Sequence, residues 1–383
     1  MSERALAAAF FERYDSFGIR RAGTDGDLAS ANWLASQLQA IESLKVAQQA
    51  VHFMRFFPGD SFLLESTGAR IEGLPLFDGG STGPDGVHGR IGTLGSAADI
   101  GFAVMEPAAA SLPNNAFATA RADSRHRAIV IALTTREGGI APLNAHDSSH
   151  PFGPPVLQIA GRHAKVVAAL SEQAAHVTLT VVGRRDTAVS RNLRAELTGT
   201  RPPLLLLTPR TSWWTSTAER AGGILAWLYT LRALATSTAR ARSVVALATC
   251  GHELGHLGAH HAFKIEPSLA REAALVIHLG ANLGTACAPA LTVRSNVTGL
   301  ADQMMRTLAS EGYPTDAIHA VTGGKASGEA HEIEQRGGRY LSLIGSNPWF
   351  HAPEDRWPVS IDLDRALSIA RSVAVLAQLM GNR

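Results

Sequence analysis

The apolar positions of this chain change their spacing along its length. Thr24 and Asp25 precede apolar residues that recur at helical spacing from Leu28 to Leu38, which predicts a capped helix. From about residue 60 to 190 the pattern changes to short β-rich runs separated by Gly, Pro, Asn and Asp. This middle region is therefore expected to form a separate β-rich module. The expected strands within it cover 128–133, 156–159 and 177–182, with a short helix after Gly161.

After residue 190, strand patterns and helix patterns alternate. The nearly continuous apolar run Leu204–Leu207 is typical of a strand that is covered on both faces. The other expected elements are a helix over 221–234, a strand over 244–248 and a last helix over about 362–380. This alternation predicts an α/β architecture with a parallel sheet. Because such sheets bind ligands beyond the carboxyl ends of their strands, we expect chemistry in the loops after Leu207, Ala248 and Leu279.

Composition narrows the classes of protein that the chain can be. The 383 residues are 45% hydrophobic and 18% charged, which is enough for one large core or two ordinary ones. The net charge is +2 without a basic block, so no nucleic-acid partner is expected. The apolar run near the N-terminus is broken by Glu12 and Arg13, which predicts neither a signal peptide nor a membrane span, and hence a cytoplasmic protein. Cys250 and Cys287 are too few for a disulfide framework.

The most conspicuous string is Gly251–His261, which contains the sequence His-Glu-x-x-His. In zincins this motif lies on a helix, where both histidines hold zinc on one face and the glutamate activates water. Here the string directly follows a strand and a Cys-Gly corner. We therefore expect His252 and Glu253 on the turn and His256 just inside the helix, which disfavours the zincin interpretation. Solvated histidines at a helix start are the alternative.

A different resemblance accounts for the same string and for other parts of the chain. Gly251–Ala259 resembles the Gly-Glu-Glu strand end and helix start of the di-zinc aminopeptidases, the family that includes aminopeptidase Y and the glutamate carboxypeptidases. Phe17–Thr24 is similar to that family's entry segment, and Phe350–Asp355 is similar to its terminal Tyr-His-Thr-Pro-x-Asp signature. Pro155–Ile159 and the helix after Gly161 resemble the protease-associated domain that is often inserted in these enzymes.

The resemblance implies an α/β fold of the zinc-exopeptidase type, with three layers and a mostly parallel central sheet. Its first part is expected to cover residues 1–60 and its second part residues 190–383. The β-rich insert, similar to a protease-associated domain, is expected between them, over residues 61–189.

Several of the family's metal-site residues are not retained at the positions that resemble them. The typical His-x-Asp falls on Pro209, Arg210 and Thr211, and the aspartate of Asn-Leu-Asp falls on Gly280. None of these residues supplies a comparable ligand for a divalent ion. The glutamate that acts as general base falls on His252. A di-zinc pair is therefore not expected.

One metal position keeps a set of ligands by the same resemblance. The bridging aspartate falls on Glu219, the second glutamate on Glu253 and the last histidine on His351. Three protein ligands and a water suffice for an open zinc site, so we expect zinc, one ion at most, with His252 placed as the base. The alternative is no metal at all, with Glu219 on a helix surface, Glu253 at a helix start and His351 in a loop.

Replacement ligands are a further possibility, at His256 or His278. His256 is expected about a turn into its helix, and His278 is expected to point opposite to Leu279 by strand alternation. Both expectations disfavour the replacement.

Two functions from different classes follow from this pattern. The first is an aminopeptidase-like metallohydrolase that acts on a peptide or small amide. The second is a non-catalytic relative that binds a small ligand or peptide. Trp213 and Trp214 are candidate pocket residues, or ordinary packing, and Glu329 is a candidate ligand contact, or a partner of backbone groups. A metal-free hydrolase using Ser212 or Ser327 lacks a Gly-x-Ser-x-Gly elbow. No motif fixes the oligomeric state.

Overall fold

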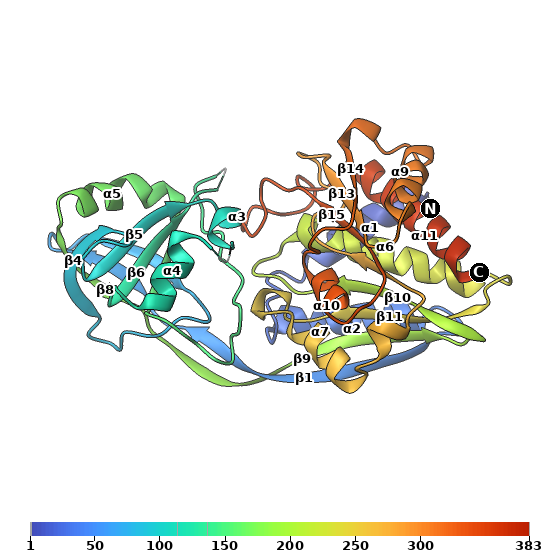
Figure 1. Ribbon diagram of the computed structural model, residues 1–383, viewed down its shortest axis with the longest axis horizontal. Coiled ribbons are helices and arrows are strands. Elements are labelled where there is room, and N and C mark those ends of the chain that lie inside the picture. The colour runs from blue at the N-terminus through green and yellow to red at the C-terminus, as the bar shows by residue number, and fades with distance from the viewer. Residues whose placement is uncertain (1, 113, 136, 383) are drawn as a thin grey trace. The chain divides into compact units, whose positions relative to one another are not determined.

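The computed structural model describes residues 2–112, 114–135 and 137–382. These residues form two compact units. The first unit contains the described residues up to Val51, Val189–Phe350 and the described residues from Glu354 onward (Figure 1). The second unit contains His52–Ala188 together with His351–Pro353.

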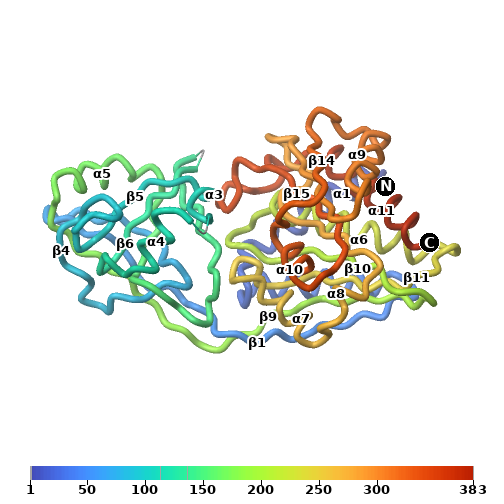
Figure 2. The backbone as a smooth tube through the Cα atoms, viewed as in Figure 1, coloured from blue at the N-terminus to red at the C-terminus, as the bar shows by residue number. Residues whose placement is uncertain are grey.

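The first unit is built on an eight-stranded sheet with the strand order β1-β9-β11-β10-β12-β15-β13-β14. β10 pairs in parallel with both β11 and β12, and β12 pairs in parallel with β15, whereas β9 and β13 join antiparallel to β11 and β15. The long strands β1 and β9 lie side by side (Figure 2). The strands are β1 (Lys45–Pro58), β9 (Gly183–Leu197), β10 (Arg201–Pro209), β11 (Arg242–Thr249), β12 (Leu275–Leu279), β13 (Leu291–Ser295), β14 (Ile318–Thr322) and β15 (Tyr340–Gly345).

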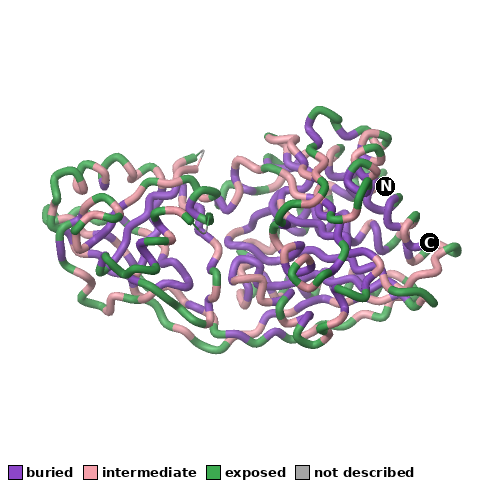
Figure 3. Tube along the Cα trace, in the orientation of Figure 1, coloured by how far each residue is buried: buried purple, intermediate pink, exposed green. Residues whose placement is uncertain are grey.

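Helices cover both faces of this sheet, and alternate residues of β10 show it directly. Leu204 and Leu206 pack in one apolar core and Leu205 and Leu207 in another, as the continuous apolar run predicts. Buried residues are concentrated in the interior of the unit (Figure 3). The first core includes residues of α1 (Glu3–Asp15), α2 (Asp25–Gln39), α6 (Thr217–Thr236), α9 (Leu300–Ser310) and α11 (Leu363–Asn382). The second includes residues of α7 (Leu257–Ile265), α8 (Leu269–Glu272) and α10 (Glu329–Gln335). The result is a three-layer α/β unit with a mixed sheet.

The central elements of this unit match the sequence predictions closely. Thr24 caps α2 by accepting a hydrogen bond from the backbone N–H of Asp27, as its position predicts. The expected helix over 221–234 is the middle of α6, which is longer by four residues at its start. A side chain at Gly222 would meet the carbonyl oxygen of Leu283, so glycine allows α6 to approach the loop after β12 closely. This approach brings the start of α6 beside the strand ends.

The second unit is a closed barrel with the strand order β2-β3-β7-β6-β5-β4-β8. Strand β6 of this barrel is buried on both faces, with Val130 in one apolar core and Ile131 in the other. The strands are β2 (Phe62–Glu65), β3 (Arg70–Pro75), β4 (Val87–Thr93), β5 (Ile100–Met105), β6 (Ala128–Leu133), β7 (Val156–Ala160) and β8 (His176–Thr180), and the helices are α3 (Pro107–Ala110), α4 (Ala116–Asp123) and α5 (Ala164–Glu172). The strands expected over 128–133 and 156–159 and the helix after Gly161 are confirmed, and the strand expected over 177–182 is β8, which ends at Thr180.

Within the described part of the chain, none of the helices combines the length and the apolar character that crossing a bilayer requires.

Candidate functional site

Buried polar side chains gather where β10, β11 and β12 end, in the loops where the parallel strand pattern predicts chemistry. Thr211 follows β10, His252 and Glu253 follow β11, and His278 is near the end of β12. Glu329, the first residue of α10, completes the set. All five side chains are buried. Two hydrogen-bonded groups can be distinguished among these residues and their neighbours.

The turn after β11 places His252 and Glu253 on a short 3-10 helix, His252–Leu254, rather than on an α-helix. Gly251 and His256 both have left-handed backbone conformations, with φ of 67° and 55°. His256 is the N-cap of α7, so the expectation that it lies just inside the helix is wrong by one residue. The two imidazole rings nevertheless approach, with centroids 4.9 Å apart. The helix that a zincin motif needs is absent from this described segment, because Gly255, with φ of 82°, and His256 end the 3-10 turn inside the motif.

The first group, which we call the arginine group, consists of Thr211, Glu219, Arg220 and Glu253. Arg220 is fully buried, with Nη2 2.7 Å from Glu219 Oε1, and its Nε donates to the carbonyl of Thr211. Thr211 Oγ1 donates to Glu253 Oε2 at 2.8 Å and accepts from the backbone N–H of Gly251 at 2.7 Å. The second oxygen of Glu253 accepts from the backbone N–H of Ala22. A single guanidinium therefore supplies the fixed positive charge among two buried carboxylates.

The start of α6 anchors the arginine group. Asp355 accepts hydrogen bonds from the backbone N–H groups of Ala218 and Glu219, at 2.8 and 2.9 Å. Burial raises the pKa of Asp355 to about 6, although these hydrogen bonds oppose the shift. Burial likewise raises the pKa of Glu253. Nearby, Asp15 accepts a hydrogen bond from Thr217 Oγ1 at 2.6 Å and forms an ion pair with Arg356.

The second group, which we call the histidine group, consists of His252, His256, His278, Glu329 and Glu332. His252 Nδ1 lies 2.8 Å from Glu329 Oε1, and His278 Nε2 lies 3.4 Å from Glu329 Oε2. His278 Nδ1 in turn lies 2.8 Å from the hydroxyl of Ser342. Glu332 Oε1 lies 3.4 Å from His256 Nδ1. Glu329 thus sits between two imidazoles, rather than serving backbone groups.

His252 and Glu329 are both buried, and their surroundings shift the pKa of each group. It lowers the pKa of His252 to about 4, which outweighs the attraction of Glu329. Burial alone would raise the pKa of Glu329, but the hydrogen bonds and charges of the histidines hold it well below its usual range. Because an ionised carboxylate can only accept, a neutral His252 donates through Nδ1 and keeps its lone pair on Nε2.

In the pair of His256 and Glu332, the pKa of the imidazole shifts in the opposite direction from that of His252. Burial would lower the pKa of His256, but the hydrogen bond with Glu332 raises it overall. The pKa of Glu332 falls to about 2, because its contacts with His256 and Arg336 outweigh burial.

Gly280 and Arg210 stand at positions where the resembled family has its metal-ligand motifs, and both make other contacts in this structure. A side chain at Gly280 would meet Ile344 at 2.8 Å and the ring of His278 at 3.0 Å, so an aspartate has no room there. Arg210 forms a buried ion pair with Asp27 at 2.6 Å. The cluster is therefore organised around other residues than those of a di-zinc site.

The remaining predicted site residues lie as follows. His351 belongs to the second unit, where its Nδ1 lies 2.7 Å from the carbonyl oxygen of Pro142. Its approach to Glu219 and Glu253 stays a prediction. The side chain of Trp213 is 1% exposed, and Trp214 is partly exposed. Their role in lining a pocket also stays a prediction.

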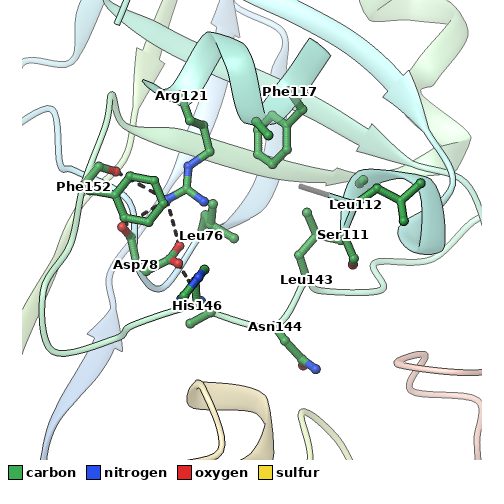
Figure 4. A pocket seen from close by; sticks show the side chains of 13 residues that line it. Leu76, Asp78, Ser111, Leu112, Phe117, Arg121, Leu143, Asn144, His146 and Phe152 are labelled. Atoms are coloured by element: carbon green, nitrogen blue, oxygen red, sulfur yellow. Dashed lines mark hydrogen bonds and ion pairs between the residues drawn. The ribbon is translucent and has the colours of Figure 1, made fainter. Parts of the chain in front are cut away.

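Two cavities have buried polar or charged side chains in their walls. A cavity of about 230 Å³ in the first unit is lined by Thr292, Arg294, Ser327, Ser342 and Ile344. One of these residues, Ser342, also contacts His278 of the histidine group. A cavity of about 410 Å³ lies in the barrel unit, where the ion pair between Arg121 and Asp78 forms part of its wall and Phe152 packs over the guanidinium (Figure 4). The two cavities share no lining residue.

This chain resembles known proteins in structure but not detectably in sequence. Neither a scan against protein-family models nor a search of curated protein sequences finds a match. Solved structures do match over nearly the whole chain. A zinc aminopeptidase from Bacillus subtilis has a TM-score of 0.76 at 18% identity, covering 97% of this chain and 94% of its own.

The chain has the zinc-aminopeptidase fold. An aminopeptidase from Aneurinibacillus sp. strain AM-1 aligns with a TM-score of 0.72 at 14% identity, covering 97% of this chain and 93% of its own. A peptidase M28 precursor from Shewanella amazonensis SB2B aligns with a TM-score of 0.71 at 15% identity, covering 99% and 96%. These likenesses show the fold, and the site must carry any argument about activity.

The matching Bacillus subtilis structure is a zinc enzyme, so the fit of a zinc ion depends on whether Glu219 and Glu253 have oxygens available for it. Glu219 is ion-paired with the Arg220 guanidinium, and Glu253 uses both carboxylate oxygens for hydrogen bonds within the protein. An ion held by these two carboxylates would require those contacts to break and would stand beside a buried cation. The arginine group as it stands does not fit a zinc ion.

The sequence pointed to His252, Glu253 and Glu329, but the partners that organise them carried no recognisable signal. Arg220 follows Glu219 in a helix, and Ser342 lies inside a strand. The sequence marks His278 only as a possible replacement ligand. Strand alternation predicts that it points opposite to Leu279, and Leu279 packs in the first apolar core.

Proposed function

We propose that this protein is an aminopeptidase-like hydrolase that acts on a peptide or small amide, with His252 as the general base. The observation that carries the proposal is the 2.8 Å contact between His252 Nδ1 and Glu329 Oε1, in a buried cluster at the carboxyl ends of parallel strands. An imidazole whose Nδ1–H is held by a carboxylate is oriented to accept a proton through Nε2.

The pair can perform both proton transfers of amide hydrolysis. His252 takes a proton from water through Nε2 while the water oxygen bonds to the amide carbonyl carbon. Glu329 stabilises the resulting imidazolium through the Nδ1–H hydrogen bond. His252 then gives the proton to the leaving nitrogen as the C–N bond breaks, which yields a carboxylic acid and an amine. His278 and Ser342 hold the second oxygen of Glu329, so the carboxylate keeps one orientation.

Hydrolysis of aminoacyl 4-nitroanilides and of small peptides by the chelator-treated protein tests the proposal. We expect His252→Ala to lower kcat/KM by about 10²–10⁴, the usual contribution of a general base. Glu329→Gln should lower kcat more than it changes KM, because it acts through the orientation of His252.

The matched control is His319→Ala, which removes an exposed histidine of β14 in the same unit. Circular dichroism of each variant shows whether the fold is kept. A panel of substrates that the parent protein does not cleave, or a folded His252→Ala variant with parental activity, would refute the assignment of the base.

A non-catalytic, ligand-binding relative is the second candidate function. The observation that favours it is the engagement of Glu219 and Glu253 by partners within the protein, which leaves the resembled enzymes' metal positions without available carboxylates. In that case peptides should bind without being cleaved, which calorimetry on uncleaved mixtures would show.

We also propose that the barrel unit corresponds to the insert of the protease-associated type expected over residues 61–189. Its buried β6 and the helix after Gly161 support this proposal. Expression of the barrel residues alone, with the chain ends joined by a short linker, would test whether they fold independently.

A further inference from the structure

Three potential metal ligands of the histidine group surround one point. The ligand atoms of His252, His256 and Glu329 lie within 4.8 Å of one another. Zinc binds imidazole nitrogen and carboxylate oxygen at about 2.0–2.2 Å, so two ligand atoms lie about 3.3 Å apart around a tetrahedral ion. The contact of 2.8 Å between His252 Nδ1 and Glu329 Oε1 is already close to that spacing. A modest shift of His256 would complete a three-ligand set.

The surroundings of these three residues suit an ion. Glu329 is 1% exposed and contacts His278 through its second oxygen, while Glu332 contacts His256 through Nδ1. Outer contacts of this kind orient metal ligands and fix their tautomers. The side chain of His256 is 23% exposed, which leaves that side of the set open to solvent.

We propose that His252, His256 and Glu329 bind one divalent transition-metal ion of the zinc type, a ligand set that includes none of Glu219, Glu253 and His351. Two imidazoles and one carboxylate, with an open fourth position, are a donor set that zinc accepts readily. The ion takes the place of the proton between His252 Nδ1 and Glu329 Oε1, and that proton moves to Nε2 of the same neutral ring. His252 then has no lone pair to accept a proton, so the bound ion inhibits the hydrolysis proposed above.

The test uses the full chain, freed of metal by chelator and dialysis, with zinc chloride alone as the first probe. Calorimetric titration should show one equivalent bound. Cobalt(II) chloride should give the intense visible bands of a tetrahedral site. His256→Ala, whose side chain is partly exposed and whose loss should leave the fold intact, should weaken zinc binding by about 10–100-fold or more, and Glu329→Gln should do the same.

Two further variants make the result specific to this site. Glu253→Gln should keep the zinc affinity, because Glu253 belongs to the arginine group, and His319→Ala should keep it as a surface control. Absence of zinc binding, or binding that survives in His256→Ala and Glu329→Gln, would overturn the proposal. Binding lost only in Glu253→Gln would also overturn it, since the ion would then lie at the arginine group.

The outcomes separate this inference from the proposed function. Hydrolysis by the metal-free protein that added zinc does not inhibit would contradict the metal site and leave the general base intact. One bound equivalent in a protein that cleaves no substrate would support the metal site and contradict the hydrolase.

Discussion

The arginine group and the histidine group lie at the ends of neighbouring strands, but they neutralise buried carboxylates in different ways. In the arginine group, a permanent guanidinium faces Glu219, and hydrogen bonds hold both oxygens of Glu253. In the histidine group, Glu329 faces two imidazoles whose charge can change. A guanidinium cannot give up its proton in a protein, whereas an imidazole exchanges protons and binds metal ions. The comparison suggests that the first group maintains the fold and the second is available for chemistry.

The largest effect on stability should come from Arg220→Met. Removing one partner of a buried ion pair typically costs about 3–5 kcal/mol, because the remaining carboxylate of Glu219 has lost its counter-charge. Urea unfolding measures the change. The double variant Glu219→Gln/Arg220→Met should recover much of the loss. If the free energy of unfolding of Arg220→Met lay within about 1 kcal/mol of the parent value, the arginine group would not have the structural role assigned to it.

Glu329→Gln should cost less stability than Arg220→Met, although it abolishes most of the proposed activity. The amide can still accept one hydrogen bond from His252 Nδ1, so we expect a loss of about 1–2 kcal/mol in the free energy of unfolding. Parallel urea curves and hydrolysis rates test the contrast. A variant that is as destabilised as Arg220→Met would contradict the division between the two groups.

Thr211→Val should destabilise by about 1–2 kcal/mol, since it removes one donor from Glu253 and one acceptor from the backbone N–H of Gly251. Thermal unfolding measures this effect. Thr67→Val, at an exposed position, is the matched control and should change little. Equal stability of both variants would show that Glu253 does not depend on this hydroxyl.

The smallest effect concerns pH and the anchor of the arginine group at Asp15. Burial opposes ionisation of this carboxyl, but hydrogen bonds with Arg356, Thr217 and the backbone of Trp357 lower its pKa below the ordinary value for an aspartate. A lowered pKa in the folded state means stability that is present above the unfolded pKa and is lost as pH falls through the folded pKa. Asp15→Asn should therefore flatten the decline in stability below about pH 4, by about 1 kcal/mol. Unfolding curves between pH 2 and 6 of parent and variant test it, and identical pH dependence would exclude the contribution.

Much of the fold could be predicted because local patterns encode it. The apolar run at Leu204–Leu207 appears as a strand with alternate residues in two cores, and Thr24 caps its helix. Turn geometry was harder. Three left-handed residues, Gly251, Gly255 and His256, separate β11 from α7 and displace the expected helix start.

The sequence by itself determined the α/β architecture, the β-rich middle region and the strand ends at which polar residues gather. These features follow from the spacing of apolar residues and from the succession of helices and strands along the chain, both of which are local properties of the sequence. Only the tertiary structure decided which of those polar residues meet. Thr211 reaches Glu253 across 42 positions of the chain, and Glu329 reaches His252 across 77. The physical reason is that a buried charge takes its partner from whichever segments the packed core brings within about 3 Å, and no local pattern records that distance.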